Sequence, residues 1–267
     1  MHSAYLTFEG ALKIAIENPY LIHQLLAFSA RHLAVLHPSE SESYMHQAIT
    51  LQTRAVSLFN SSCIPISQST GIPVLLFATV LGHHVLTDTL CRRDPGGLDI
   101  FLEYFIPCLE TQRGIFTIYK TASPLLRASE LEPILKMSSD LTSRKPRGTR
   151  CLRVKELVER STILSQADKE ACKVALDYLQ VGFDAVMDKN EHPGNQYQLL
   201  FLWCMLVPRE YTALLAARNM ESVLILGYYA ILLTHGRALW QVGDAGEYLM
   251  ELVRAYVVPR LDWDWEI

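Results

Sequence analysis

Apolar residues recur at three- and four-residue steps along the stretch "HQLLAFSARHLAVLHP", which covers residues 23–38. This spacing places one apolar stripe along an α-helix, and small alanines in between allow a neighbouring helix to approach closely. Pro19 suits the first turn of such a helix, and Pro38 ends it. The pattern therefore predicts a helix of about five turns between the two prolines.

Two more helices follow in the pattern. Ser39 to Glu42 fits a capping box, which predicts that the next helix begins there and runs to Phe59. The stretch "STGIPVLLFATVLGHHVLTDTLCRR" predicts a third helix, with Pro73 in its first turn, and the turn sequence "DPGG" ends it.

Residues 98–109 continue in helical rhythm, and "QRGIFTIYK" after them could form a strand when taken in isolation. A single strand would leave its backbone groups unpaired, so we expect helix or turn. The basic segment "TSRKPRGTRC", residues 142–151, predicts a solvated loop or a partly disordered one. Ser165 and Asp168 then form a cap signal for a helix that reaches about Asn190.

The remaining sequence contains four helical pieces, "QYQLLFLWCML", "PREYTALLAARN", "MESVLILGYYAILLTHGRALW" and "AGEYLMELVRAYVVPRL". The third is apolar on every side from Met220 to Leu233, so other helices must surround it. We therefore predict an all-α fold, a single-domain multi-helix bundle over residues 1–267. The loop at 142–151 is an alternative boundary between two helical layers.

Composition narrows the classes of partner. Half of the 267 residues are hydrophobic and 19% are charged, against about 25% in an average domain, which indicates extensive burial. The net charge of −4 provides no general attraction for nucleic acid or an anionic membrane, so we expect no direct DNA contact. The apolar run "VLILGYYAILL" is shorter than the roughly 20 residues of a bilayer span, so no membrane span is predicted.

The cysteines and the first residues of the chain indicate the cellular compartment. The six cysteines are scattered without a close pair, which indicates reduced thiols rather than a zinc knuckle or a disulfide framework. The opening "MHSAYLTFEGALK" shows no secretory signal. We therefore expect an intracellular protein, cytoplasmic or nuclear.

Catalytic and metal-binding motifs are weak. His84 and Asp88 lie four residues apart on one helical face, a spacing that can hold a metal, but no further ligands accompany them, and we interpret the pair as structural or pocket-lining. No nucleophile elbow and no glycine-rich phosphate loop occurs. We therefore expect no metal and no cofactor.

Three separated segments resemble one family. "HQLLAFSARHLA" resembles the "LLALSALHLA" helix of the C-terminal regulatory domain of fungal zinc-binuclear-cluster transcription factors, those like the sterol uptake control proteins. "RGIFTIYK" is similar to the family's mid-domain segment, and residues 209–257 are similar to its closing helices. The resemblance implies an all-α fold with a hydrophobic pocket among the C-terminal helices. Met220 replaces the family's proline, and the six-cysteine zinc cluster is absent, so a cut-out domain and a stand-alone relative are both open.

Two functions are open on this basis. The first is a regulatory module that binds a hydrophobic small molecule of the sterol, terpenoid or polyketide kind, and a homodimer is open as a further partner. Its expected pocket residues are Phe77, Leu81, His84, Trp203, Tyr228 and Trp240. The alternative is a cofactor-free cyclase of the Diels–Alderase type, which needs shape and one hydrogen-bond donor. Its candidate donors are His84, Tyr104, Tyr228 and Tyr229.

Overall fold

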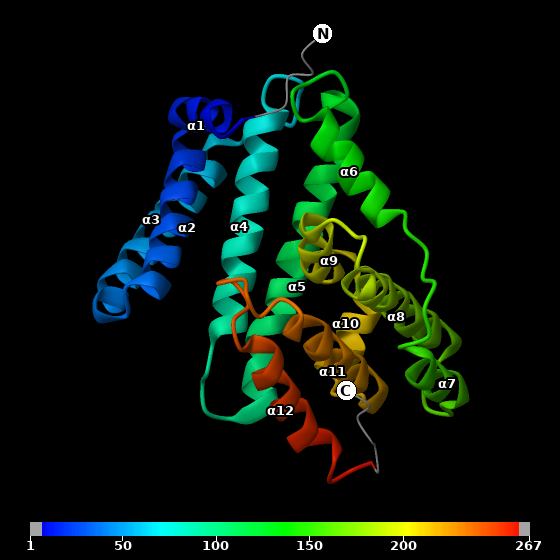
Figure 1. Cartoon of the computed structure of the whole chain (residues 1–267). Coiled ribbons are helices and arrows are strands. Elements are labelled where there is room, and N and C mark those ends of the chain that lie inside the picture. The colour runs from blue at the N-terminus through cyan, green and yellow to red at the C-terminus, as the bar shows by residue number, and fades with distance from the viewer. Residues whose placement is uncertain (1–6, 262–267) are drawn as a thin grey trace. The chain divides into compact units, whose positions relative to one another are not determined.

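The computed structural model describes residues 7–261, and within this range all regular structure is helical, with no β-strand (Figure 1). The predicted all-α fold is therefore confirmed. The twelve α-helices are α1 (Phe8–Glu17), α2 (Pro19–Leu36), α3 (Ser41–Ser62), α4 (Gly71–Cys91), α5 (Gly97–Ala122), α6 (Glu132–Thr142), α7 (Leu152–Arg160), α8 (Gln166–Met187), α9 (Pro193–Leu206), α10 (Arg209–Ala216), α11 (Met220–Thr234) and α12 (Ala245–Val257). Two short 3-10 helices, η1 (Pro38–Glu40) and η2 (Ser123–Leu126), complete the set.

The chain divides into two compact units. Unit 1 comprises Met1–Leu86 and Gly114–Asp140, and unit 2 comprises Thr87–Arg113 and Leu141–Ile267. Helices α4 and α5 each contribute residues to both units. The prediction of a single domain stays a prediction.

Unit 1 is built around the helix that opened the sequence pattern. Helix α2 begins at Pro19. Proline suits this position because it lacks a backbone N–H, and the first N–H groups of a helix have no partner within the helix. Helix α2 packs along α3. At their core the ring of Phe77 stacks on Phe59 with centroids 4.5 Å apart, and Tyr20 meets both rings edge-on. The helix predicted between Pro19 and Pro38 is present as α2.

The predicted capping box at Ser39 is wrong. Residues Pro38–Glu40 form the 3-10 turn η1, and α3 starts at Ser41 without a side-chain cap. A capping side chain must come from a residue with non-helical backbone angles. Because Ser39 lies inside the 3-10 turn, its hydroxyl is not placed to accept from the amides of α3.

Helices α4 and α5 follow the predicted order. Pro73 occupies the third position of α4, so its ring lies within the first turn as predicted. Helix α5 runs without a break through "QRGIFTIYK" to Ala122, which confirms helix over strand for that segment. Pro107 lies inside α5, which the apolar spacing does not predict, and it removes one backbone hydrogen bond there.

Unit 2 surrounds the apolar helix α11. All residues from Glu221 to Leu233 are buried, as a helix that is apolar on every side requires. Helix α8 packs against α11 and begins with the predicted capping box: Ser165 Oγ accepts from Asp168 N, and Asp168 Oδ2 accepts from Ser165 N. Helix α11 ends at Thr234, six residues before the end of the predicted helical piece, and turns lead to α12.

The loop between α6 and α7 has the predicted position but is ordered rather than disordered. Asp184 on α8 accepts hydrogen bonds from the backbone amides of Arg147 at 2.6 Å and Gly148 at 2.9 Å. Gln180, one turn earlier, accepts from Cys151 N at 2.9 Å, and Cys151 is fully buried. Side chains of α8 therefore fix the backbone of this loop.

Among residues 7–261, helix α4 alone is long and apolar enough to cross a membrane. If α9 and α10, which meet at a bend of 78°, are counted together as one span, there are up to two such segments. In the most apolar part of α4, 56% is buried inside the protein. A core helix meets the same criteria of length and composition, so no clear membrane span is indicated.

Candidate functional site

A groove opens on unit 2 between α7 and the start of α11. Its volume is about 670 Å³, within the range of roughly 300–1,000 Å³ that small-molecule sites have. The lining comes from α7, the link to α8, the first turn of α11 and the residue Leu261. The lining residues are Arg153, Glu156, Leu157, Arg160, Ser161, Thr162, Ile163, Met220, Glu221 and Leu261. We call this feature the α7–α11 groove.

The local sequence explains how the wall of the groove forms. Helix α7 is amphipathic and buries Val154 and Val158, so the side chains on its other faces are free to line the groove. Ser161 Oγ then accepts hydrogen bonds from the backbone amides of Ile163 and Leu164. This turn buries Leu164 and leaves Ile163 82% exposed, with its apolar side chain at the groove.

The groove contains one glutamate that is buried over most of its surface. Glu221 lies in the first turn of α11, where the helix dipole favours negative charge, and it is only 7% exposed. Among residues 7–261, no hydrogen bond or ion pair reaches this carboxylate. It lies near Cys172 on α8, where burial, together with the Glu221 and Asp168 carboxylates, raises the pKa of that thiol to about 12.

Among residues 7–261, the formal charges that line the groove cancel. They come from two arginines and two glutamates, and Arg160 pairs with Glu156 at 3.4 Å on the exposed side of α7. An ionic ligand would disturb this balance. The arrangement favours an uncharged ligand with an apolar body.

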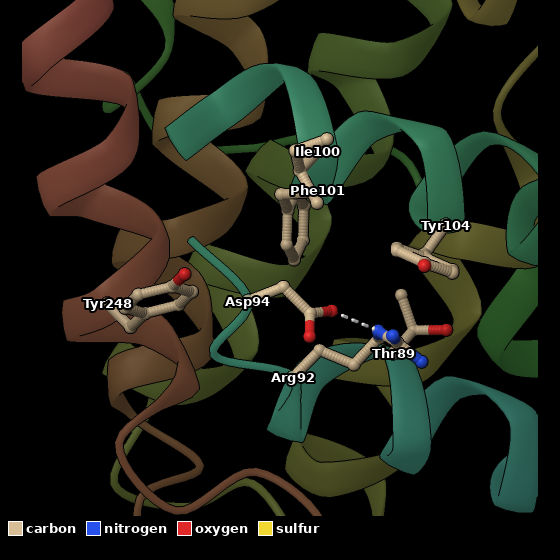
Figure 2. Close-up of a pocket in the computed structure, with 7 residues that line it drawn as sticks. All are labelled: Thr89, Arg92, Asp94, Ile100, Phe101, Tyr104 and Tyr248. Carbon is tan, nitrogen blue, oxygen red and sulfur yellow. Dashed lines mark hydrogen bonds and ion pairs between the residues drawn. The ribbon is translucent and has the colours of Figure 1, made fainter. Parts of the chain in front are cut away.

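A second, much smaller pocket of unit 2 is shown in Figure 2. It is lined by Thr89, Arg92, Asp94, Ile100, Phe101, Tyr104 and Tyr248. The Arg92 guanidinium lies over the ring of Tyr104, 3.6 Å from its centroid, and pairs with Asp94 at 2.6 Å (Figure 2). Its volume of about 10 Å³ is close to what a single water molecule occupies. We interpret this pocket as a structural feature of unit 2.

Three of the predicted pocket residues belong to unit 1. Phe77 is 2% exposed in the aromatic cluster described above, and Leu81, on the same helix, packs against that cluster. His84 is buried, and its Nδ1 accepts a hydrogen bond from Nε2 of Gln24 at 3.2 Å. All three make the contacts expected of core residues.

The other predicted residues belong to unit 2. Trp203 is 1% exposed, donates from Nε1 to the carbonyl of Ala175, and stacks on Tyr229 with centroids 4.2 Å apart. Tyr228 is buried with its ring edge-on to Phe183, and Trp240 is half-buried. None of the six predicted pocket residues lines the α7–α11 groove, and neither does any of the four predicted donors. Their joint pocket stays a prediction.

Sequence reasoning missed the residues that line the groove. Ile163 gave one usable signal, because it and Leu164 are the two apolar residues of an otherwise polar turn just before a helix cap. Glu221 gave none, since an acidic residue in the first turn of a helix is ordinary.

Within residues 7–261, no group of three or more His, Cys, Asp or Glu side chains is placed to hold a metal ion. The resemblance to the fungal regulatory domains stays a prediction. No family model, no curated protein and no solved structure matches this chain.

Proposed function

We propose that this chain is a binding module for a hydrophobic small molecule, which the α7–α11 groove of unit 2 holds. The observation that carries the proposal is the groove itself, with its volume of about 670 Å³ and a lining whose accessible surface is mostly apolar, although six of the ten described lining residues are polar. The sterol, terpenoid and polyketide classes fit this description, because such molecules combine a large apolar body with few polar groups.

The energetics are adequate for such a ligand. Burial of about 300 Å² of apolar ligand surface would contribute roughly 7 kcal/mol before ordering costs. Part of that surface would cover Ile163, whose side chain is exposed to water without a ligand. The net affinity would fall in the micromolar range if only small ordering costs follow.

The resemblance to regulatory domains supports a regulatory role for binding. The groove joins residues of α7, α11 and the segment after α12, so a ligand in it contacts three separate parts of unit 2. A ligand that fits one arrangement of these parts better than another would shift the population toward it. The ligand would then act as a signal.

A binding screen tests the proposal. We expect at least one sterol, terpenoid or polyketide in a panel to raise the melting temperature of the protein and to appear in its complex by native mass spectrometry. Ile163→Glu should weaken that binding at least tenfold, because it places a charge in the apolar part of the groove.

Met187→Glu is the matched control, since Met187 is 70% exposed on α8 and does not line the groove. It should leave binding unchanged. The absence of any binder, or equal binding by the Ile163→Glu protein, would overturn the proposal.

A further inference from the structure

We propose that Glu221 is the polar anchor of the groove and accepts a hydrogen bond from a hydroxyl group of the ligand. The inference rests on the proposed function and deepens it, because it names the chemistry that the groove selects. The ligand would be an uncharged apolar molecule that carries a hydroxyl group, in preference to an analogue without one.

The burial of Glu221 sets it apart from other acidic residues at helix starts. Glu210 holds the equivalent place in the first turn of α10, and there it is exposed to solvent. Interaction with the helix dipole therefore does not require burial. Glu221 is 93% buried and faces the groove, where a ligand would remove the remaining water from it.

The carboxylate oxygens of Glu221 keep contact with water, since neither is among the buried side-chain atoms that lack a partner. A ligand in the groove would remove that water, and a ligand hydroxyl could replace it. An ionised carboxylate only accepts hydrogen bonds, so its partner must be a donor. No donor among residues 7–261 reaches it. An ether or a ketone at the same place has no hydrogen to donate, so it would leave the carboxylate buried and unpaired. A ligand that leaves a buried polar group of its site unpaired binds much more weakly than one that pairs with it.

The charges around Glu221 favour a hydroxyl over an ionised donor or acceptor. Among the described residues, two arginines and two glutamates line the groove. An ammonium group would bring a third cation beside Arg153 and Arg160, and a carboxylate would meet Glu221 directly. A hydroxyl gives the donor that Glu221 lacks without a change in net charge.

The test compares an alcohol with its methyl ether. Farnesol and cholesterol are the two alcohols, each measured against its own methyl ether by calorimetry or by thermal shift with the full chain. The wild-type protein should bind at least one alcohol ten- to a hundredfold more tightly than the ether. In Glu221→Ala the alcohol and its ether should bind with equal affinity, because the ether no longer buries an unpaired carboxylate.

Two further variants make the result specific. Glu210→Ala is the matched control and should keep the preference for the alcohol. Glu221→Gln retains an acceptor oxygen of similar shape, so it should fold if Glu221→Ala does not, and it should lose part of the preference.

The outcomes separate the two proposals. Equal affinity for alcohol and ether in the wild-type protein, or an unchanged preference in both Glu221 variants, would overturn the anchor role and leave the proposed function standing. No binding of any of the four molecules would overturn this inference, and the proposed function falls as well if the wider panel yields no binder.

Discussion

The thiol of Cys204 donates a hydrogen bond to the hydroxyl oxygen of Tyr229 across 3.1 Å, inside unit 2. Both side chains are fully buried, and Trp203 stacks on the tyrosine ring. Burial raises the pKa of both groups well above their usual values, so both are neutral at pH 7. The pair therefore stabilises the core and has no ionised form that could attack a substrate.

The buried thiols should be inert in the folded protein. Burial raises the pKa of Cys108 to about 11 and that of Cys151 to about 12, and only the thiolate reacts with alkylating agents. We expect iodoacetamide at pH 7.5 to label exposed Cys63 first and half-buried Cys91 more slowly. Peptide mass spectrometry before and after denaturation checks this. Rapid native labelling of Cys204 would show that unit 2 opens readily.

Asp184 should protect the basic loop from proteolysis. It accepts hydrogen bonds from Arg147 N, Gly148 N and the Gln180 side chain. Asp184→Ala should lower the free energy of unfolding by about 1–3 kcal/mol, because these donors lose their partner. It should also speed trypsin cleavage within residues 144–150 several-fold, since the loop carries four basic side chains.

The control for this prediction is Asp140→Ala, because Asp140 is exposed just before the same loop. It should change neither stability nor cleavage. Equal cleavage of the Asp184→Ala and wild-type proteins would contradict the role of Asp184 as the anchor.

The fold was predictable wherever the signals are local. The apolar spacing predicted α2, and Ser165 with Asp168 predicted the start of α8, because these patterns act within one or two turns. The order of the loop at 142–151 was not predictable. Its backbone is held by Gln180 and Asp184, which lie more than 25 residues later in the chain, and no local pattern reveals such a partner.

The site was less predictable than the fold. Aromatic residues in apolar helices indicated a pocket, and two of them, Trp203 and Tyr229, stack on each other, while the pocket itself stays a prediction. The groove instead combines α7, the start of α11 and Leu261, three segments far apart in the chain. The burial of Glu221 depends on how these segments pack, so the sequence could not distinguish it from an exposed glutamate at a helix start.

The ion pair of Arg144 with Glu191 should make stability depend on pH. Arg144 donates to both carboxylate oxygens, at 2.6 and 3.2 Å, and these bonds hold the pKa of Glu191 at about 2, below its usual 4.5. A lowered folded-state pKa stabilises the fold above the unfolded-state pKa, and that contribution is lost as the pH falls. We expect the loss between pH 4.5 and about 2.

Urea unfolding of the wild type and Glu191→Gln at several pH values measures this contribution. The wild type should be more stable at pH 7 by about 2 kcal/mol, the order of a hydrogen-bonded charge pair. The difference should shrink steadily below pH 4.5. A difference that stays constant down to pH 2 would show that Glu191 keeps an ordinary pKa.

Two glycines should respond in opposite ways to the same substitution. A Cβ on Gly246, at the start of α12, would lie 2.7 Å from Thr234 N and 2.9 Å from Ala230 O, which are backbone atoms of α11 or its end. Backbone cannot move aside as a flexible side chain can, so Gly246→Ala should force α12 away from α11. We expect a loss of about 1–3 kcal/mol in the free energy of unfolding.

Gly114 is the matched control, because it lies inside helix α5 and a Cβ there would meet nothing within 4 Å. Gly114→Ala should stabilise the protein by about 0.5–1 kcal/mol, since alanine loses less backbone freedom than glycine when a helix forms. Urea unfolding of the two variants side by side measures both effects. If Gly246→Ala instead raised the free energy of unfolding, the close approach of α12 to α11 would be contradicted. Such a gain is expected only where the added methyl group meets open space.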